Sequence, residues 1–283
     1  MTARSRKRQG FLWVAGILAV ALLAALGDAF LVEPTAYVAD RVVVRSARLP
    51  DSWIGRKILL FSDTHLGFGM TAGDIQRFGD LLAAESPDLV LFLGDCVDVA
   101  TPEDAAFLEA AGKAFGQVDA PLGKFACLGN HDNRLRKERG MFLTVMEAGG
   151  FEVLENRSVL LDGVRVGGLA EAYYGNPDPA TTFSEVDADV FRILMAHQPR
   201  LGMSDDVLST ASPDLVFSGH THGGQVTFFG LPLPVYRRIL GPYISGVYEQ
   251  GGTTVLVTRG VGTYALRARF FCRPEYVVVT LER

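Results

Sequence analysis

The stretch "DLVLFLGDCVD", residues 88–98, is a short apolar run that ends in a glycine and two carboxylates. Its apolar residues follow one another without polar alternation, which is typical of a β-strand that is covered on both faces. Other runs share this character: "KILLFSD" (57–63), "GKFACLGN" (123–130), "FRILMAH" (191–197), "PDLVFSG" (213–219) and "TTVLVTRG" (253–260). The sequence therefore predicts several strands inside a layered domain.

The segments between these runs have apolar residues at helical spacing. "AGDIQRFGDLLAAES" (72–86) is one, and "TPEDAAFLEAAGKAF" (101–115) is another, with Thr101 expected as the N-cap and Pro102 in the first turn. Strand and helix in alternation predict an α/β fold. The strand-like segments "DGVRVGGLA" (162–170) and "EYVVVTLE" (275–282) indicate a second sheet that packs on the first.

All five histidines lie at or just after the end of a predicted strand: His65, His131, His197, His220 and His222. Polar oxygen donors occupy equivalent places: Asp63, Asp95, Asp98 and Asn130. In α/β sheets, ligands bind outside the carboxyl ends of the strands. We therefore expect one site built from five strand ends.

Imidazole, carboxylate and amide groups form a mixed nitrogen and oxygen donor set that suits Mn²⁺, Fe or Zn²⁺. In "GHTH" (219–222), His220 and His222 would point the same way, because alternate side chains of extended backbone share a face. With Asp95 in the centre, the donors divide into two sites that share a bridging carboxylate. Such a binuclear centre suits displacement at phosphorus.

The charge of the chain fits this reading. The net charge is −5 and the sequence pI is about 5.6, which argues against a nucleic-acid partner. An acidic protein that handles phosphate needs another source of positive charge, and two metal ions would supply it. The three cysteines are expected to be buried and unpaired, with a Cys96–Cys127 disulfide as the alternative.

Other polar residues near these motifs are candidates for contact with substrate. His131 follows Asn130 directly, so it should point toward substrate and act on the leaving oxygen. Asp98 is the first candidate to orient His131, and Asp132 is the second. Arg134 and Arg259 are candidate phosphate ligands, although each could be an ordinary surface or salt-bridge arginine.

The motifs "DTH", "GDCVD", "GNHD", "MAHQP" and "GHTH", in this order, resemble those of the calcineurin-like binuclear metallophosphoesterases. The resemblance covers residues 36–283 and implies a four-layer αββα sandwich of two mixed sheets flanked by helices. It also implies two divalent ions, Mn²⁺ first with Fe or Zn²⁺ as alternatives, and attack by a metal-bridging hydroxide. One ion would be held by Asp63, His65, Asp95 and His222, and the other by Asp95, Asn130, His197 and His220. His131 would assist the leaving group with support from Asp98.

A narrower resemblance points to the class of substrate. Val99 and Ala100 follow Asp98 where the protein phosphatases of the superfamily have "RG", which argues against a phosphoprotein substrate. "GHTHGGQV" and the C-terminal segment are similar to a bacterial membrane-associated subgroup of phosphodiesterases and chlamydial-type UDP-2,3-diacylglucosamine pyrophosphatases. This implies hydrolysis of a phosphodiester or pyrophosphate bond, with UDP-2,3-diacylglucosamine of lipid A biosynthesis as a candidate substrate. The alternatives are a general phosphodiesterase or phosphomonoesterase of extracytoplasmic envelope material, and, least favoured, a catalytically silent metal-binding module.

Two apolar segments bear on the membrane. Residues 1–9 form a basic tail and residues 10–32 a predicted single-pass anchor to the inner membrane, with a cleaved signal peptide or a buried core helix as alternatives. The positive-inside bias slightly favours a cytoplasmic N-terminus, which would place the catalytic domain outside the cytoplasm. A nucleotide-linked substrate would instead lie on the cytoplasmic side, so the side of the catalytic domain stays open. Residues 227–248, rich in Gly, Pro and aromatic residues, are either a covered loop or an apolar lip for an acyl chain or the bilayer.

Overall fold

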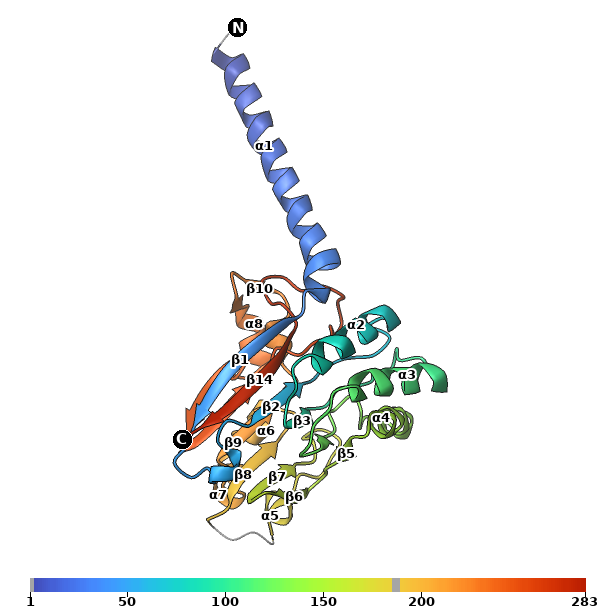
Figure 1. Ribbon diagram of the computed structural model, residues 1–283. Coiled ribbons are helices and arrows are strands. Elements are labelled where there is room, and N and C mark those ends of the chain that lie inside the picture. Colours follow the sequence, from blue (N-terminus) through green and yellow to red (C-terminus); the bar gives the residue numbers. More distant parts are fainter. Residues whose placement is uncertain (1–2, 185–188) are drawn as a thin grey trace.

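The computed structural model describes residues 3–184 and 189–283, and its main body contains two six-stranded mixed sheets (Figure 1). The first sheet has the order β1-β14-β2-β3-β4-β5. Its strands are β1 (Val38–Arg45), β2 (Lys57–Phe61), β3 (Leu89–Phe92), β4 (Lys124–Ala126), β5 (Glu152–Val153) and β14 (Glu275–Glu282). Neighbouring strands are parallel except at β14, which runs antiparallel to β2.

The second sheet has the order β12-β13-β9-β8-β7-β6. Its strands are β6 (Arg157–Leu161), β7 (Val164–Gly168), β8 (Phe191–Met195), β9 (Leu215–Ser218), β12 (Gly246–Gln250) and β13 (Thr253–Val257). The four central strands are parallel, and the two edge strands, β12 and β6, are antiparallel to their neighbours. Every apolar run that was predicted to be a strand is confirmed.

The alternation of side chains along each strand explains why the two sheets pack together. In β2, Ile58 and Leu60 face the core between the sheets, where they meet side chains of the second sheet such as Ile193 and Phe217. Leu59 and Phe61 point the other way, into a core shared with helices. Because both faces of the strand are covered, its sequence shows no polar alternation.

Helices cover the outer face of each sheet and complete the four layers. The first sheet is covered by α2 (Ala72–Ala83), α3 (Ala105–Gly116) and α4 (Arg136–Gly149), whose apolar residues share its core. The short helices α5 (Pro179–Thr182), α6 (Pro199–Gly202) and α7 (Asp205–Thr210) lie at the core on the other side of the second sheet. The predicted αββα sandwich is confirmed.

Two details of the sequence prediction were wrong. Helix α3 begins at Ala105 with Asp104 as its N-cap, not at Thr101. The hydroxyl of Thr101 is used elsewhere, because it accepts from the Asp98 amide at 2.7 Å and donates to the Leu66 carbonyl at 2.6 Å. The closing strand β14 does not join the second sheet but inserts into the first, between β1 and β2.

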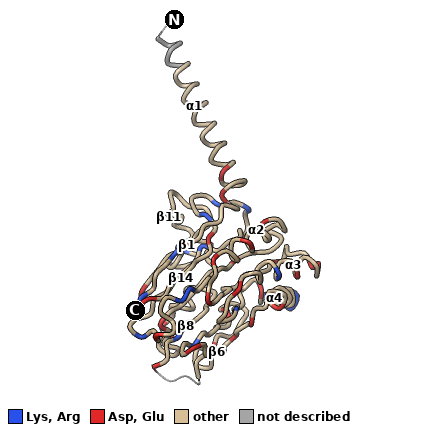
Figure 2. Tube along the Cα trace, in the orientation of Figure 1, with Lys and Arg blue, Asp and Glu red and all other residues tan. Residues whose placement is uncertain are grey.

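The N-terminal segment projects from the domain as helix α1 (Ala3–Gly27), followed by a π-helical turn η1 (Asp28–Val32) and a 3₁₀ turn η2 (Glu33–Thr35) (Figure 1). The span from Gln9 to Thr35 is long and apolar enough to cross a membrane, and none of its most apolar window is buried. Between Gln9 and Gly27 the projecting helix carries no charged residue, and Figure 2 shows the stretch above Asp28 in tan. Residues 1–2 of the predicted basic tail 1–9 lie outside the described residues. The alternative of a buried core helix is wrong.

Smaller elements connect these layers and border the site. They are η3 (Asp51–Trp53), η4 (His222–Gly224), a hairpin of β10 (Thr227–Phe228) and β11 (Leu231–Pro232), and helix α8 (Pro234–Leu240). The three cysteines are buried and free, as predicted, and no Cys96–Cys127 disulfide forms.

Candidate metal centre

Loops from both sheets meet at the carboxyl ends of β2, β3, β4, β8 and β9. The Asp63 carboxylate after β2 accepts from the His220 amide after β9, at 3.0 and 3.1 Å to its two oxygens. The Asp95 carboxylate after β3 accepts from the His131 amide after β4, at 2.9 Å. Hydrogen bonds from a backbone amide of one loop to a carboxylate of another therefore hold together loops that are distant in sequence.

Five of the predicted metal ligands have a left-handed backbone. The φ angles are 57° at Asp63, 41° at His65, 58° at Asp95, 71° at His220 and 51° at His222. Residues other than glycine rarely adopt such angles, and each costs about 1–3 kcal/mol unless neighbouring contacts enforce it. The loops bend sharply after each strand, and the bend turns the side chains into a common space.

Glycines make this close approach of loops feasible. A Cβ atom on Gly219 would lie 2.6 Å from the Asp63 Oδ2 atom, and one on Gly94 would lie 2.8 Å from the His197 Nδ1 atom. Both distances are shorter than a van der Waals contact, so a larger residue would push the ligands apart.

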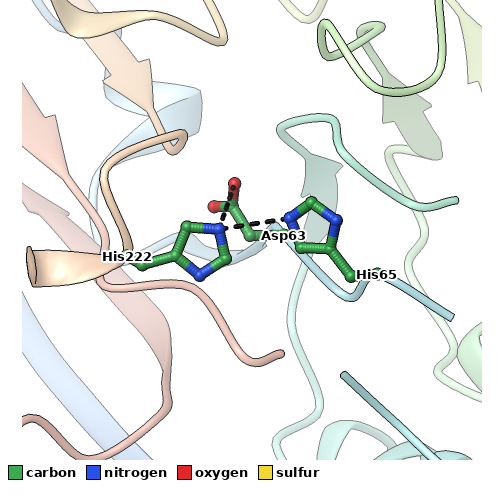
Figure 3. A group of neighbouring side chains, drawn as sticks. All are labelled: Asp63, His65 and His222. Atoms are coloured by element: carbon green, nitrogen blue, oxygen red, sulfur yellow. Dashed lines mark hydrogen bonds and ion pairs between the residues drawn. The ribbon is translucent and has the colours of Figure 1, made fainter. Parts of the chain in front are cut away.

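The first group of donors consists of Asp63, His65 and His222, whose ligand atoms all lie within 4.8 Å of one another (Figure 3). The Nε2 atoms of His65 and His222 are 3.1 Å apart, and the Nε2 atom of His222 is 3.7 Å from the Asp63 Oδ1 atom. All three side chains are buried. Two imidazole nitrogens and a carboxylate oxygen thus converge on one point away from water.

The second group consists of Asp95, His197 and His220. The Nδ1–H of His197 donates to the Leu93 carbonyl at 2.7 Å, since a carbonyl can only accept. The Nε2 atom of His197 then faces the Asp95 Oδ2 atom at 3.2 Å. The same oxygen lies 3.8 Å from the Nε2 atom of His65, so Asp95 stands between the two groups.

Burial favours neutral imidazole at His220 and His222. Burial lowers the pKa of His220 to about 3, and it lowers the pKa of His222 well below its usual value. Burial would raise the pKa of Asp95, but the neighbouring His197 outweighs it and holds that pKa well below normal. Against the effect of burial, Asp95 raises the pKa of His197 to about 10. Neutral imidazole and ionised carboxylate are the forms that bind metals.

The donors fit a pair of divalent cations. The Nε2 atom of His197 is buried without a hydrogen-bond partner and faces a carboxylate oxygen, an arrangement that needs a proton or a metal ion between the two atoms. The Leu93 carbonyl fixes the ring in the tautomer that offers Nε2, as is usual for histidine ligands. A mixed nitrogen and oxygen set without thiolate suits Mn²⁺, Fe or Zn²⁺.

Asp98 lies between His65 and His131. Its Oδ2 atom is 3.3 Å from the Nδ1 atom of His65 and 3.4 Å from the Nδ1 atom of His131. Burial opposes ionisation of Asp98, but the two imidazoles outweigh burial and lower its pKa. Burial would lower the pKa of His131, but the Asp98 carboxylate raises it above its usual value. Asp98 is thus placed to orient both rings.

Asp132, the second candidate to orient His131, has a different place. Its carboxylate accepts from the amides of Asp95 and Gly129 at 2.7 and 2.9 Å, and from those of Cys96 and Val97 at 2.8 and 3.0 Å. Burial and the nearby Asp95 raise its pKa to about 7. Asp132 therefore holds the loop of Asp95 rather than the His131 ring.

Polar residues that were not predicted connect Asn130 to the rest of the site. The Nε2 atom of Gln198 lies 3.4 Å from the Asn130 Oδ1 atom and donates to the Glu171 carboxylate at 3.1 Å. Glu171 also accepts from the amides of Tyr173 and Tyr174 at 2.7 and 2.6 Å. Gln198 adjoins His197 in "MAHQP", which is a weak sequence signal, whereas Glu171 has no motif around it.

The structure does not bring the two candidate phosphate-binding arginines into the cluster. Arg259 pairs with the Glu275 carboxylate through its amide, at 2.8 Å, and through its guanidinium. Its side chain lines a separate cavity with Asp28 and Glu33 at the base of η1. Arg134 is exposed on the loop between His131 and α4.

A cavity of about 250 Å³ leads from the histidines to α8. It is lined on one side by His220, His222 and Tyr264, and on the other by Tyr236, Ile239 and Leu240 of α8. The Tyr264 ring lies 4.7 Å from the His131 ring and 5.5 Å from the His65 ring, between centroids. Sequence gave no signal for Tyr264, because its place depends on hydrogen bonds of its backbone to the Gln225 side chain.

Comparison with known proteins agrees with this geometry. Residues 56–224 match the model of the family described as calcineurin-like phosphoesterase. The chain is 33% identical to the uncharacterized metallophosphoesterase YkuE of Bacillus subtilis, over 98% of this chain and 97% of that protein. It is 25% identical to the UDP-2,3-diacylglucosamine pyrophosphatase LpxG of Chlamydia muridarum (82% and 86% covered) and 29% identical to the phosphodiesterase YaeI of Escherichia coli (84% and 86% covered). The chain belongs to the calcineurin-like metallophosphoesterase family.

Proposed function

We propose that this protein is a membrane-anchored phosphoesterase that hydrolyses a phosphodiester or pyrophosphate bond in a lipid-linked substrate, with UDP-2,3-diacylglucosamine as the leading candidate. The observation that carries the proposal is the cavity that joins His220 and His222 to the apolar side chains of α8. A polar phosphate and an apolar chain on one molecule would find matching surroundings at its two ends.

In this proposal Asp63, His65, Asp95 and His222 hold one metal ion, and Asp95, Asn130, His197 and His220 hold the other. Two divalent ions bound in this way would supply a hydroxide nucleophile at neutral pH and would neutralise the charge of the phosphoryl oxygens. Asp95 is the shared ligand, in keeping with its position between the two donor groups.

His131 supplies the proton for the leaving oxygen. Its Nδ1 atom faces Asp98, which keeps the ring in one orientation and favours its protonated form. The ring is largely buried and lies against Tyr264 at the edge of the cavity. An oriented imidazole of this kind is suited to general acid catalysis. Arg134, exposed near the same loop, stays a candidate for a substrate contact.

The surroundings of the site and the names of the relatives support this class of substrate. The chlamydial relative is named for a pyrophosphatase of a diacylated nucleotide sugar, which is a lipid-linked substrate of this kind. The long apolar helix α1 provides the single-pass anchor to the inner membrane that such a substrate would require.

Full-length protein, purified in detergent and supplied with Mn²⁺, is expected to hydrolyse bis-p-nitrophenyl phosphate and, in mixed micelles, UDP-2,3-diacylglucosamine. The Asp95→Asn variant should lose both activities, because it removes the shared ligand. If both substrates are left intact by the unsubstituted protein with Mn²⁺, Fe²⁺ and Zn²⁺ in turn, the proposal fails.

A second candidate function is a general phosphodiesterase, the activity for which the Escherichia coli relative is named, and we propose extracytoplasmic envelope material as its substrate. A panel of diesters and monoesters separates the two. Hydrolysis of glycerophosphodiesters but not of UDP-2,3-diacylglucosamine would support the second candidate and exclude the first.

A further inference from the structure

An exposed apolar surface lies beside the opening of the site. We define the docking surface as the hairpin β10–β11, helix α8 and Phe271. Its apolar side chains are unusually exposed: Phe228 64%, Phe229 70%, Leu231 67%, Val235 52%, Ile239 65% and Phe271 47%. Three of its aromatic rings form a contiguous cluster, with centroids 4.8 Å apart for Phe228 and Phe229 and 4.9 Å apart for Phe229 and Phe271. Contiguous exposed apolar patches mark sites of contact with a protein or a membrane.

The docking surface is tied to the segment that follows α1. The Arg269 amide donates to the Ala29 carbonyl at 2.9 Å, and the Glu33 carboxylate accepts from the amides of Phe271, at 2.9 Å, and Cys272. The Thr227 amide at the start of the hairpin donates to the Phe270 carbonyl at 2.9 Å. Continuous hydrogen bonds therefore join the end of α1 to the hairpin, which lies on the same side of the domain as α1 (Figure 1).

The charge of this region differs from that of the rest of the chain. Residues 219–248 and 264–274 contain no Asp or Glu, although the whole chain has 32 acidic residues and a net charge of −5. Exposed arginines flank the apolar side chains: Arg237, Arg238, Arg267 and Arg273. Apolar side chains with flanking basic residues and without acidic ones are typical of a surface that binds anionic lipid headgroups.

We propose that the docking surface lies in the headgroup region of the bilayer leaflet from which α1 emerges, as a second membrane contact that presses the opening of the active site against the lipid. This inference rests on the proposed function for the anchor and for the lipid-linked substrate. A bilayer fits better than a protein partner, because α1 already brings this side of the domain to the membrane and because exposed arginines flank the apolar side chains, with Arg267 also paired to Asp74.

The proposal gives the cavity a role as a route from the leaflet to the phosphate site. In α8, Val235 and Ile239 are exposed, and Ile239 also lines, together with Tyr236 and Leu240, the cavity that ends at His220 and His222. The lipid-facing side of the helix thus borders the cavity directly. The acyl chains of a substrate would stay in the leaflet or against α8 while its phosphate reaches the histidines.

The test measures depth in the membrane with the full chain in nanodiscs of phosphatidylcholine and phosphatidylglycerol. Phe229→Cys carries a nitrobenzoxadiazole label, and Leu160→Cys carries the same label as a matched control. Leu160 is 55% exposed on β6, at the end of the domain far from α1 (Figure 1). The native cysteines are buried, so labelling is expected to be selective.

Spin-labelled lipids should quench the label at residue 229 strongly and leave the label at residue 160 almost unaffected. Equal, weak quenching at both positions would overturn the proposal. A blue-shifted but unquenched label at residue 229 would also overturn it, because protein rather than lipid would then cover the surface.

An activity measurement completes the test. The double variant Phe228→Ser with Phe229→Ser should raise the KM for UDP-2,3-diacylglucosamine in nanodiscs roughly tenfold or more, because two apolar side chains no longer enter the lipid. Hydrolysis of bis-p-nitrophenyl phosphate should not change. An unchanged KM for the lipid substrate would contradict the docking surface, whereas failure of the unsubstituted protein on both substrates would contradict the proposed function and leave the quenching result to decide the docking surface.

Discussion

At the scale of residues, the site depends on strained backbone angles and on a glycine that leaves no room for a Cβ atom. Asp63, His65 and Asp95 have positive φ angles, and the neighbouring amides and carboxylates hold them there. Gly129 packs directly on Asp95, so that a Cβ atom at this position would overlap both the carboxylate and the backbone nitrogen of Asp95. Strain at such positions is stabilised by the surrounding loops and is characteristic of functional sites.

Replacement of Gly129 by alanine should therefore displace Asp95. We expect a loss of stability of about 1–3 kcal/mol from overpacking, together with weaker binding of Mn²⁺. Thermal unfolding with and without Mn²⁺ measures both effects. Gly140→Ala in α4 is the matched control, since a Cβ atom there meets nothing within 4 Å, and it should be neutral or stabilising. Equal behaviour of the two variants would show that the contact with Asp95 does not matter.

The role of His131 predicts a dependence on the leaving group. In His131→Gln, hydrolysis of an alkyl phosphodiester should fall by about 10²–10⁴-fold, because a poor leaving group needs the proton that His131 supplies. A p-nitrophenyl ester should lose much less, since p-nitrophenolate leaves without protonation. The ratio of kcat values for the two esters measures the effect. A uniform loss for both would instead assign His131 to binding of the phosphoryl group.

At the scale of elements, the turns η1 and η2 are anchored in the domain by buried polar groups. The Arg269 side chain is fully buried and donates to the carbonyls of Gly260 and Gly262 at 3.0 and 2.7 Å, and to that of Cys272 at 3.1 Å. Cys272 in turn contacts the His222 carbonyl through its Sγ atom at 3.3 Å. The segment after α1 is therefore connected to a loop that touches a candidate metal ligand.

The Glu33→Gln variant tests this connection. The neutral amide cannot satisfy both the Phe271 and Cys272 amides, so we expect a loss of about 1–3 kcal/mol in the free energy of unfolding. Denaturant unfolding of the full chain in detergent gives this value. Glu109→Gln is the control, because its pair with Lys113 is exposed and is worth at most about 1 kcal/mol. A loss no larger than in the control would mean that Glu33 does not anchor the segment.

Helices and strands could be predicted from the sequence where the residues of the element itself show which of its faces are buried. Stretches such as 58–61 and 193–196 lack polar residues because both faces of the strand are covered, and this property can be seen in the sequence itself. The start of α3 was not predictable, because Thr101 bonds to Leu66, a residue distant in sequence. The same holds for β14, whose place between β1 and β2 depends on packing across the whole first sheet.

At the scale of the whole molecule, the sandwich brings the carboxyl ends of strands from two different sheets to one place. β2, β3 and β4 carry donors from the first sheet, and β8 and β9 carry donors from the second. Motif order and strand ends were enough to predict that the side chains of these two groups lie together. They could not predict Tyr264, Glu171 or the pairing of Arg259 with Glu275, which arise from contacts between segments far apart in the chain.

The central claim is that Asp95 joins two metal sites in one cluster, and the number of bound ions tests it most directly. Metal-depleted full-length protein should take up two Mn²⁺ per chain in equilibrium dialysis followed by mass spectrometry of the metal. Asp95→Asn should weaken both sites, whereas His222→Ala should weaken one and leave the other occupied. Binding of fewer than two ions by the unsubstituted protein, or of two ions with unchanged affinity by Asp95→Asn, would contradict the account.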